Sequence, residues 1–168
     1  MFECITIVPA GHVGVQVTLG TVNQEPLSEG VHFVNPISSV KNVEVRVVKG
    51  ELKGSSAGTK DLQVVHTDIV VNYRIDGKEA ANMYKEYGLD LENKILLPAT
   101  NESFKAVTAH YNSEELVTKR AEVSQTIHTT LQEKVGKYGL TVSEISLVNF
   151  GFSPEYQAAI EQKVISTQ

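Results

Sequence analysis

The stretch between Pro9 and Pro36 constrains the fold most strongly, because its apolar and polar residues alternate with a period of two. After the break at Pro9-Ala10-Gly11, one parity is apolar: Val13, Val15, Val17 and Leu19. Successive side chains of a β-strand point to opposite faces, so this pattern predicts a half-buried strand that stops at Gly20. A polar loop over 21–29 then leads into a second short strand over 31–34.

Two further strands are predicted before residue 77. The first covers 43–48, and a long one covers 62–76, with a Ser/Gly-rich loop over 54–59 between them. In the long strand the apolar parity changes from even to odd, which predicts a β-bulge near residues 66–68, because one extra residue reverses every following side chain. Short connections between consecutive strands indicate mostly antiparallel pairing.

From Asp76-Gly77 onward the pattern becomes helical. A short helix is expected over 78–87, ended by Gly88, and a second over 91–111, with a kink or break at Pro98. A third helix is predicted over 113–138, with Asn112 or Ser113 as its N-cap and Gly139 after its end. Its buried stripe contains Leu116, Val123, Ile127, Leu131, Val135 and Tyr138.

The last segments return to a strand and then to a helix. Residues 140–152 are apolar on both faces, which predicts a central or well-covered strand, and Ser153-Pro154-Glu155 is a typical helix start. The fold class is therefore α+β. Residues 9–76 form a β-rich, mostly antiparallel part, residues 77–152 form a helix-rich part, and residues 153–168 begin a long helix that we expect to continue.

Composition narrows the classes of function. The 168 residues include 15 basic and 20 acidic ones in a well-mixed order, with a net charge of −5, which argues against nucleic acid as a partner. The sequence contains no Lys/Arg cluster of the kind that binds anionic lipid head groups. Its N-terminus lacks the features of a signal peptide. Cys4 is the only cysteine, so an internal disulfide is excluded; an inert thiol is expected, with lipidation or a disulfide to another chain as the alternatives.

Catalytic and metal-binding signatures are missing from the sequence. It contains no phosphate-binding loop, dinucleotide fingerprint or nucleophile elbow. The five histidines are scattered without metal-ligand spacing. His66-Thr67-Asp68 is the one cluster that invites a catalytic interpretation, and we interpret it as a polar bend in a strand. We therefore expect no enzyme activity, no cofactor and no metal.

Five segments in order along the chain carry a resemblance to a known family: VPAGHVGV, SEGVHFVNP, VVNYRID, YNSEELVTKRAEVS and SPEYQAAIEQKV. Together they resemble the stomatin/prohibitin/flotillin (SPFH) domain family, and within it the prohibitins, over essentially the whole chain. In that family the domain follows a membrane-embedded segment and precedes a coiled-coil stem. By resemblance, residues 1–8 are a membrane-proximal stub, and residues 153–168 are the start of the stem.

The resemblance implies a non-catalytic scaffold on a membrane. Such proteins oligomerise into ring- or cage-like assemblies, with themselves or a paralogue, and organise membrane microdomains. For prohibitin-like members the implied client in protein quality control is an AAA-type membrane protease. The implied location is a bacterial or mitochondrial inner membrane, on a side that the sequence does not specify.

Two sets of residues are the expected contact sites. The predicted membrane contacts are Phe2, Ile5, Ile7 and Ile37, because apolar residues in a stub and a loop are otherwise exposed to water. The predicted oligomer interface combines charged residues on the third helix with apolar positions of the stem: Glu115, Lys119, Arg120, Glu122, Tyr156, Ile160 and Val164.

Two other functions fit the same sequence. A soluble, monomeric adaptor would bind a partner peptide at an open sheet edge and ignore lipid. An enzyme would need a pocket between the β-rich and helix-rich parts, lined by titratable groups with perturbed pKa values.

Overall fold

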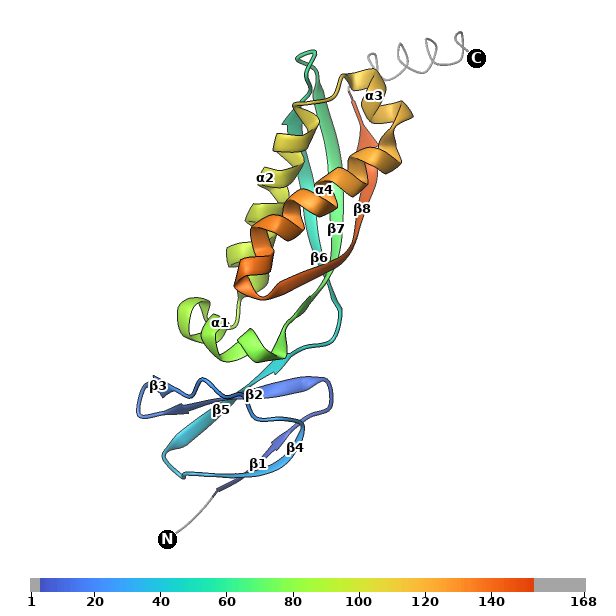
Figure 1. Ribbon diagram of the computed structural model, residues 1–168. Coiled ribbons are helices and arrows are strands. Elements are labelled where there is room, and N and C mark those ends of the chain that lie inside the picture. Colours follow the sequence, from blue (N-terminus) through green and yellow to red (C-terminus); the bar gives the residue numbers. More distant parts are fainter. Residues whose placement is uncertain (1–3, 153–168) are drawn as a thin grey trace.

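The computed structural model describes residues 4–152, and these form an elongated α+β fold (Figure 1). Strands of residues 4–44, which we call the β-rich part from here on, occupy the lower end in this view. The helix-rich part, residues 48–152, occupies the middle and upper end and includes the strands of residues 48–75 that the sequence pattern assigned to the β-rich part. All strand pairs are antiparallel, as the sequence predicted. The predicted helix over 153–168 lies outside the described residues.

Two small sheets build the lower end. A two-stranded sheet pairs β1 (Cys4–Val8) with β4 (Gly30–Val34). A three-stranded sheet has the order β3-β2-β5, from Thr21–Val22, His12–Thr18 and Ser38–Glu44. Val15 and Val43 of this second sheet pack against Ala80 and Ala81, which attaches the β-rich part to the first helix.

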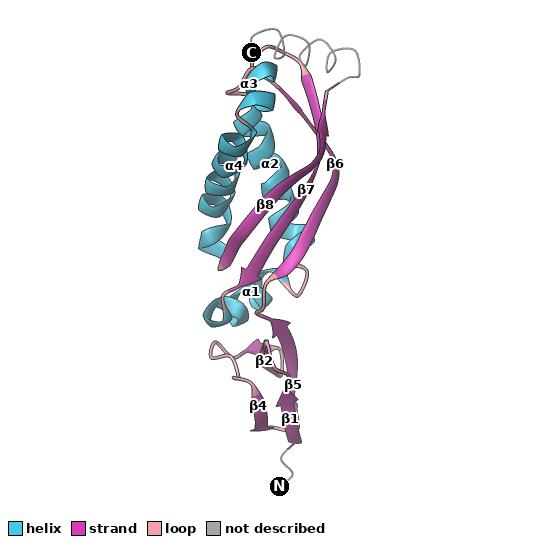
Figure 2. Ribbon diagram, turned by 90° about the vertical axis from the view of Figure 1, so that its right-hand side faces the viewer, coloured by secondary structure: helices cyan, strands magenta, loops and turns pink. Residues whose placement is uncertain are grey.

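A larger three-stranded sheet, with the order β6-β7-β8, organises the helix-rich part. Its strands are β6 (Val48–Gly58), β7 (Val64–Ile75) and β8 (Leu140–Gly151). Helices α2 (Leu97–Thr108) and α4 (Arg120–Val135) cover one face of this sheet, and the other face is open (Figure 2). The main core lies between them and includes Ile69, Leu96, Phe104, Leu116, Ile127 and Leu131.

The first predicted helix is confirmed. A 3-10 turn, η1 (Gly77–Glu79), leads into α1 (Ala80–Tyr87), and Gly88 ends it with φ 77°. The irregularity expected around Pro98 is also present, because a π-helical segment, η2 (Glu92–Leu96), precedes α2 and places Pro98 in the first turn of the α-helix. The Leu97 amide still donates to the Glu92 carbonyl, but Pro98 has no N–H with which to continue this hydrogen-bond ladder, so the helix is irregular here.

The predicted third helix is two helices, so the expectation of one continuous helix was wrong. Asn112 caps α3 (Ser113–Thr118) through a capping box with Glu115. The chain then turns at Lys119, with φ −114° and ψ 34°, before α4 starts. The Thr118 hydroxyl donates to the carbonyl of Glu114 directly before this turn.

The end of this helical region agrees with the sequence. Five of the six predicted stripe residues are fully buried: Leu116, Val123, Ile127, Leu131 and Val135. Tyr138 is half-buried in the 3-10 turn η3 (Gly136–Tyr138), and Gly139 follows with φ 82° in the left-handed region.

Two strand boundaries differ from the prediction. Residues 45–47 separate β5 from β6, where the chain passes from one sheet to the next and the Val45 amide donates to the Gly11 carbonyl at 2.8 Å. The predicted loop over 54–59 lies largely within β6, which has a bulge between Leu52 and Ser55. Gly54 occupies that bulge with φ 67°, so glycine there marks an irregular strand rather than a loop.

The predicted parity change in β7 is also wrong, because its inward residues are odd throughout: Val65, Thr67, Ile69, Val71 and Tyr73. A register shift does occur between His66 and Asp68, but the extra residue is on β8. A second shift at Asn72/Tyr73 leaves Ser143 of β8 unmatched. These two bulges explain why β8 has apolar residues of both parities. It is an edge strand, so the first of the two predicted alternatives, a central strand rather than a well-covered one, was wrong.

Candidate functional site

The β1–β4 sheet carries an exposed apolar surface at the lower end of the molecule (Figure 1). Ile5 lies opposite Phe33 and Ile7 lies opposite Val31, so four apolar side chains form two cross-strand pairs on one face. Their exposed fractions are between 61% and 69%. Neither strand contains a charged residue. We call these four residues, Ile5, Ile7, Val31 and Phe33, the apolar face.

The inner parity of the same strands explains why the apolar face points to water. Val8 and Val34 are buried, at 2% and 7% exposure. Gly14 of β2 makes room for this packing, because a Cβ atom at residue 14 would lie 2.9 Å from Val8 Cγ2 and 2.8 Å from Val40 Cγ1. One face of the β1–β4 sheet therefore packs against the rest of the domain, and the other face is exposed to solvent.

Two more apolar residues of the β-rich part, Leu19 and Ile37, are exposed. Thr18 and Ser38 are the last pair of the β2–β5 ladder, so Leu19 and Ile37 follow at the same end of that ladder. Leu19 was expected to be on the buried side of its strand, and that expectation was wrong. It occupies the turn before Gly20 with φ 50° and is 79% exposed. A two-residue turn between paired strands favours positive φ at both of its central residues. Leu19 therefore follows the geometry of the turn and not the inward–outward alternation of the strand.

The predicted membrane contacts are thus partly brought together. Ile5, Ile7 and Ile37 are all exposed in the β-rich part, and Phe2 lies outside the described residues. Sequence reasoning missed Val31, Phe33 and Leu19. A strand over 31–34 was predicted, but it has apolar residues of both parities. The pairing with β1 was therefore needed to identify which side faces outward.

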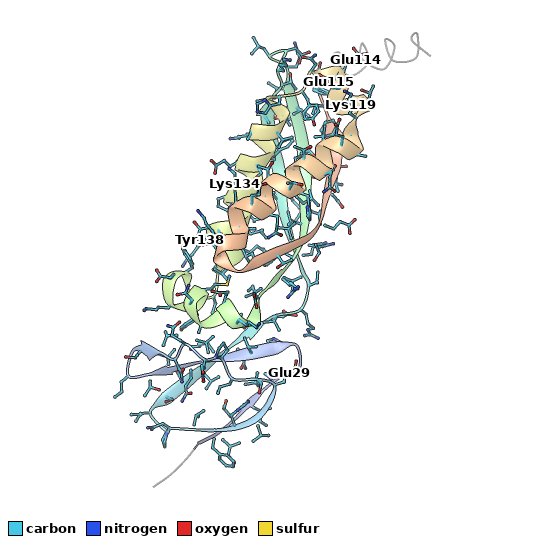
Figure 3. The ribbon with its side chains drawn as sticks, viewed as in Figure 1. Glu29, Glu114, Glu115, Lys119, Lys134 and Tyr138 are labelled. Atoms are coloured by element: carbon cyan, nitrogen blue, oxygen red, sulfur yellow. The ribbon has the colours of Figure 1, made fainter. Side chains whose placement is uncertain are left out.

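Of the predicted assembly residues, Glu115 and Lys119 lie at the opposite end, on and directly after α3 (Figure 3). Lys119 Nζ is 3.6 Å from Glu115 Oε2, the i,i+4 pair that the sequence suggested. Glu115 Oε1 also accepts the Asn112 amide, and this hydrogen bond, followed by the charge of Lys119, lowers the pKa of Glu115. Both side chains are therefore already engaged within the molecule.

Arg120 and Glu122 follow the break at Lys119, so the four charged residues do not share one helix. The Arg120 guanidinium donates to the Leu147 carbonyl at 2.6 Å and lies over the Phe150 ring, 4.9 Å from its centroid. Glu122 is exposed on α4. The other predicted interface residues, Tyr156, Ile160 and Val164, lie outside the described part of the chain.

Helix α4 also covers the free edge of β8. The Gln132 side-chain amide donates to the Leu140 carbonyl at 3.1 Å and accepts the Val142 amide at 2.7 Å, as a neighbouring strand would. His128 Nε2 lies 2.8 Å from the Val142 carbonyl, which requires the tautomer protonated at Nε2. With Arg120 on Leu147, these bonds occupy backbone groups that a peptide would need at this edge. They weigh against an adaptor that binds through β8.

The cluster around His66 does not form a catalytic relay. Ser56 Oγ lies 2.8 Å from His66 Nδ1, but Asp68 is oriented elsewhere. Its carboxylate accepts the Gly54 amide and the Asn149 side-chain amide, and these bonds, in that order, lower its pKa. The serine–histidine pair is exposed, and His66 belongs to the parity of β7 that faces away from the core.

Two hollows on the described surface lie in the helix-rich part. One of about 520 Å³ lies between α2 and α4, with Val107, His110, Tyr111 and Thr126 among its lining residues. Another of about 340 Å³ is lined by residues that include Lys94, Glu102, Lys134 and Tyr138. Neither lies between the β-rich and helix-rich parts, where the sequence-based enzyme hypothesis placed its pocket.

Within residues 4–152, no three His, Cys, Asp or Glu side chains converge to hold a metal ion. In the same part of the chain, none of the helices has the length and apolar character needed to cross a bilayer.

Comparison with known proteins places this fold in a family. Residues 6–168 match the SPFH domain / Band 7 family. The chain is 33% identical to Prohibitin-2 of Mus musculus over 168 residues, covering 99% of this chain and 56% of that protein. It is 32% identical to Prohibitin-1 of Saccharomyces cerevisiae over 148 residues, covering 88% of this chain and 51% of that protein. The chain spans about half the length of these relatives. It belongs to the SPFH domain / Band 7 family and is prohibitin-like.

Proposed function

We propose that this chain is the membrane-facing domain of a non-catalytic scaffold, with the apolar face lying against a bilayer. The observation that carries the proposal is the exposure of Ile5, Ile7, Val31 and Phe33 on one uncharged sheet. Contiguous exposed apolar side chains typically mark protein or membrane interaction sites. Leu19 and Ile37 are further exposed apolar residues of the β-rich part.

In the full scaffold, copies oligomerise into ring- or cage-like assemblies. Glu115 and Lys119 lie far from the apolar face along the molecule (Figure 3), and Glu122 is exposed on α4, so these charged residues remain accessible when that face is on a membrane. An exposed ion pair contributes only about 0–1 kcal/mol, so assembly relies on many weak contacts in one plane. Membership of the prohibitin-like family supports an inner-membrane location, microdomain organisation and restraint of an AAA-type membrane protease or another client.

The strength of the membrane contact follows from the area available. Fully burying a side chain such as isoleucine or phenylalanine contributes about 1.5–3 kcal/mol. The four side chains of the apolar face are about two-thirds exposed and would enter the interface only partly, at about 1 kcal/mol each. The sum of about 4 kcal/mol corresponds to roughly a thousandfold change in partitioning.

Flotation of the 168-residue chain with phosphatidylcholine/phosphatidylglycerol vesicles tests this proposal. The test variant replaces Ile5, Ile7, Val31 and Phe33 with serine. A control variant replaces Leu62, Val64 and Val148, which are exposed apolar residues of the other end and of the large sheet. We expect the test variant to stay with the unbound protein and the control to float like wild type. Equal flotation of all three proteins would contradict the proposal.

A further inference from the structure

The sheets of this molecule differ in how their edges are protected. A strand edge presents unpaired N–H and C=O groups, and proteins block such edges with charges, prolines, bulges, very short strands or covering side chains. In the two three-stranded sheets, each edge strand has at least one of these devices. The β1–β4 sheet has none of them within its strands.

Each edge strand of the two three-stranded sheets carries such a device. β8 is covered by Arg120, His128 and Gln132 of α4. β6 carries Lys49 and Lys53 and has a bulge before Ser55. β3 is two residues long, and β5 contains Lys41 and Glu44.

Both strands of the β1–β4 sheet are edge strands, because the sheet has only two. Their sequences, CITIV and GVHFV, contain no lysine, arginine, acid or proline. Their register is unbroken over five residue pairs, from Cys4↔Val34 to Val8↔Gly30. An isolated two-stranded sheet is marginally stable in water, and a sheet of three or more strands is much more stable.

We propose that this sheet is where copies of the chain join, with β4 of one copy pairing antiparallel with β1 of the next. This inference rests on the proposed function, because the membrane holds the copies at one height. The occupant is a second copy because it supplies an equally uncharged, unbulged strand of the same length. Each new pair places its apolar face beside the previous one, so a continuous apolar band lies on the bilayer.

Pairing β4 with β1 uses two different edges, so the contact is heterologous. Contacts of this kind continue from copy to copy and close into a ring when the rotation between neighbours permits. The alternative, in which like edges pair across a two-fold axis, would stop at a dimer and leave the other two edges open. Only the first arrangement agrees with a ring-forming scaffold.

Disulfide cross-linking between singly labelled proteins distinguishes these arrangements. In a Cys4→Ser background, one variant carries Thr6→Cys in β1 and another carries His32→Cys in β4. These residues face each other within one sheet, so an equal mixture of the two variants can link them only between molecules. Matched scans through residues 5–7 and 31–33 allow for a shifted register.

The control mixture combines Lys49→Cys of β6 with Ser146→Cys of β8, the two protected edges of the large sheet. On phosphatidylcholine/phosphatidylglycerol vesicles, we expect about tenfold more cross-linked dimer from the β1/β4 mixture than from the control, because pairing raises the local thiol concentration. Either β1 or β4 variant alone should give no more than the control.

Three results would overturn the inference: no β1/β4 combination exceeds the control, a single variant cross-links with itself as well as the mixture does, or all positions react equally. The same samples are floated in parallel. Flotation without cross-linking would contradict the strand pairing alone, whereas cross-linking without flotation would contradict the membrane contact. Absence of both would contradict both proposals.

Discussion

Replacing Asp61 with asparagine should destabilise the domain in a pH-dependent way. Asp61 lies in the turn between β6 and β7, at the end of the molecule far from the apolar face. Its carboxylate accepts hydrogen bonds from the hydroxyl of Thr59 and from both the amide and the hydroxyl of Ser113, at 3.0 and 2.7 Å. Ser113 is the first residue of α3, so Asp61 ties that helix to the large sheet.

The lowered pKa of Asp61 sets the size of the expected loss of stability. Partial burial opposes ionisation, but the hydrogen bonds from Thr59 and Ser113 outweigh it and lower the pKa from 3.8 to about 2. For a group shielded from water, this shift corresponds to roughly 2.4 kcal/mol. Asp61 is exposed, so solvent screening reduces the expected contribution to about 1 kcal/mol. That free energy shifts the melting temperature of a chain of this size by about 3 °C.

The lowered pKa also determines the direction in which the stabilisation by Asp61 changes with pH. The stabilisation is fully present above the unfolded-state pKa of 3.8 and is lost as pH falls toward about 2. Urea unfolding of wild type and Asp61→Asn at several pH values between 3 and 7 measures the difference. We expect about 1 kcal/mol at pH 7 and a smaller gap below pH 4. Glu133→Gln, on the exposed side of α4, is the control and should behave like wild type. A pH-independent gap, or none at pH 7, would refute this reasoning.

Three other outcomes are expected. Gln132→Ala should lower stability by about 1–3 kcal/mol and accelerate exchange of the Val142 amide, with Gln125→Ala as a control that leaves both unchanged. In solution at micromolar concentration the chain should sediment as a monomer or weak dimer at low and high salt, and a salt-insensitive ring would contradict this. Esterase, protease, phosphatase and nucleotide substrates should not be turned over, and hydrolysis abolished by His66→Ala would contradict the non-catalytic function.

Where the side-chain pattern was locally decisive, the sequence predicted the fold correctly. Gly88 and Gly139 follow helical stretches as expected, and the Asn112 cap precedes a helix with acid in its first turn. The stripe on α4 was recognisable because its residues recur at helical spacing and face one sheet. Strands β1 and β3 and most of β6 were not predicted, since pairing partners decide which segments form a ladder and where it ends.

The errors have physical causes that no local pattern reveals. Ser143 and Asn149 sit at register shifts of β8, and each shift changes the parity of the residues that follow. Apolar residues of both parities therefore resembled a strand covered on two faces. Likewise, Val31 and Val34 are equally apolar, and only contact with the body of the domain buries Val34 and leaves Val31 exposed. The apolar face is a product of tertiary packing.

The most direct test of the account is the depth of single spin labels in vesicle-bound protein. In the Cys4→Ser background, one label replaces Val31 on the apolar face and a control label replaces Leu62, which is 90% exposed at the opposite end. We predict that oxygen in the bilayer relaxes the label at residue 31 strongly, while a water-soluble relaxation agent reaches only the label at residue 62. Equal access of the water-soluble agent to both positions would contradict membrane docking by the apolar face.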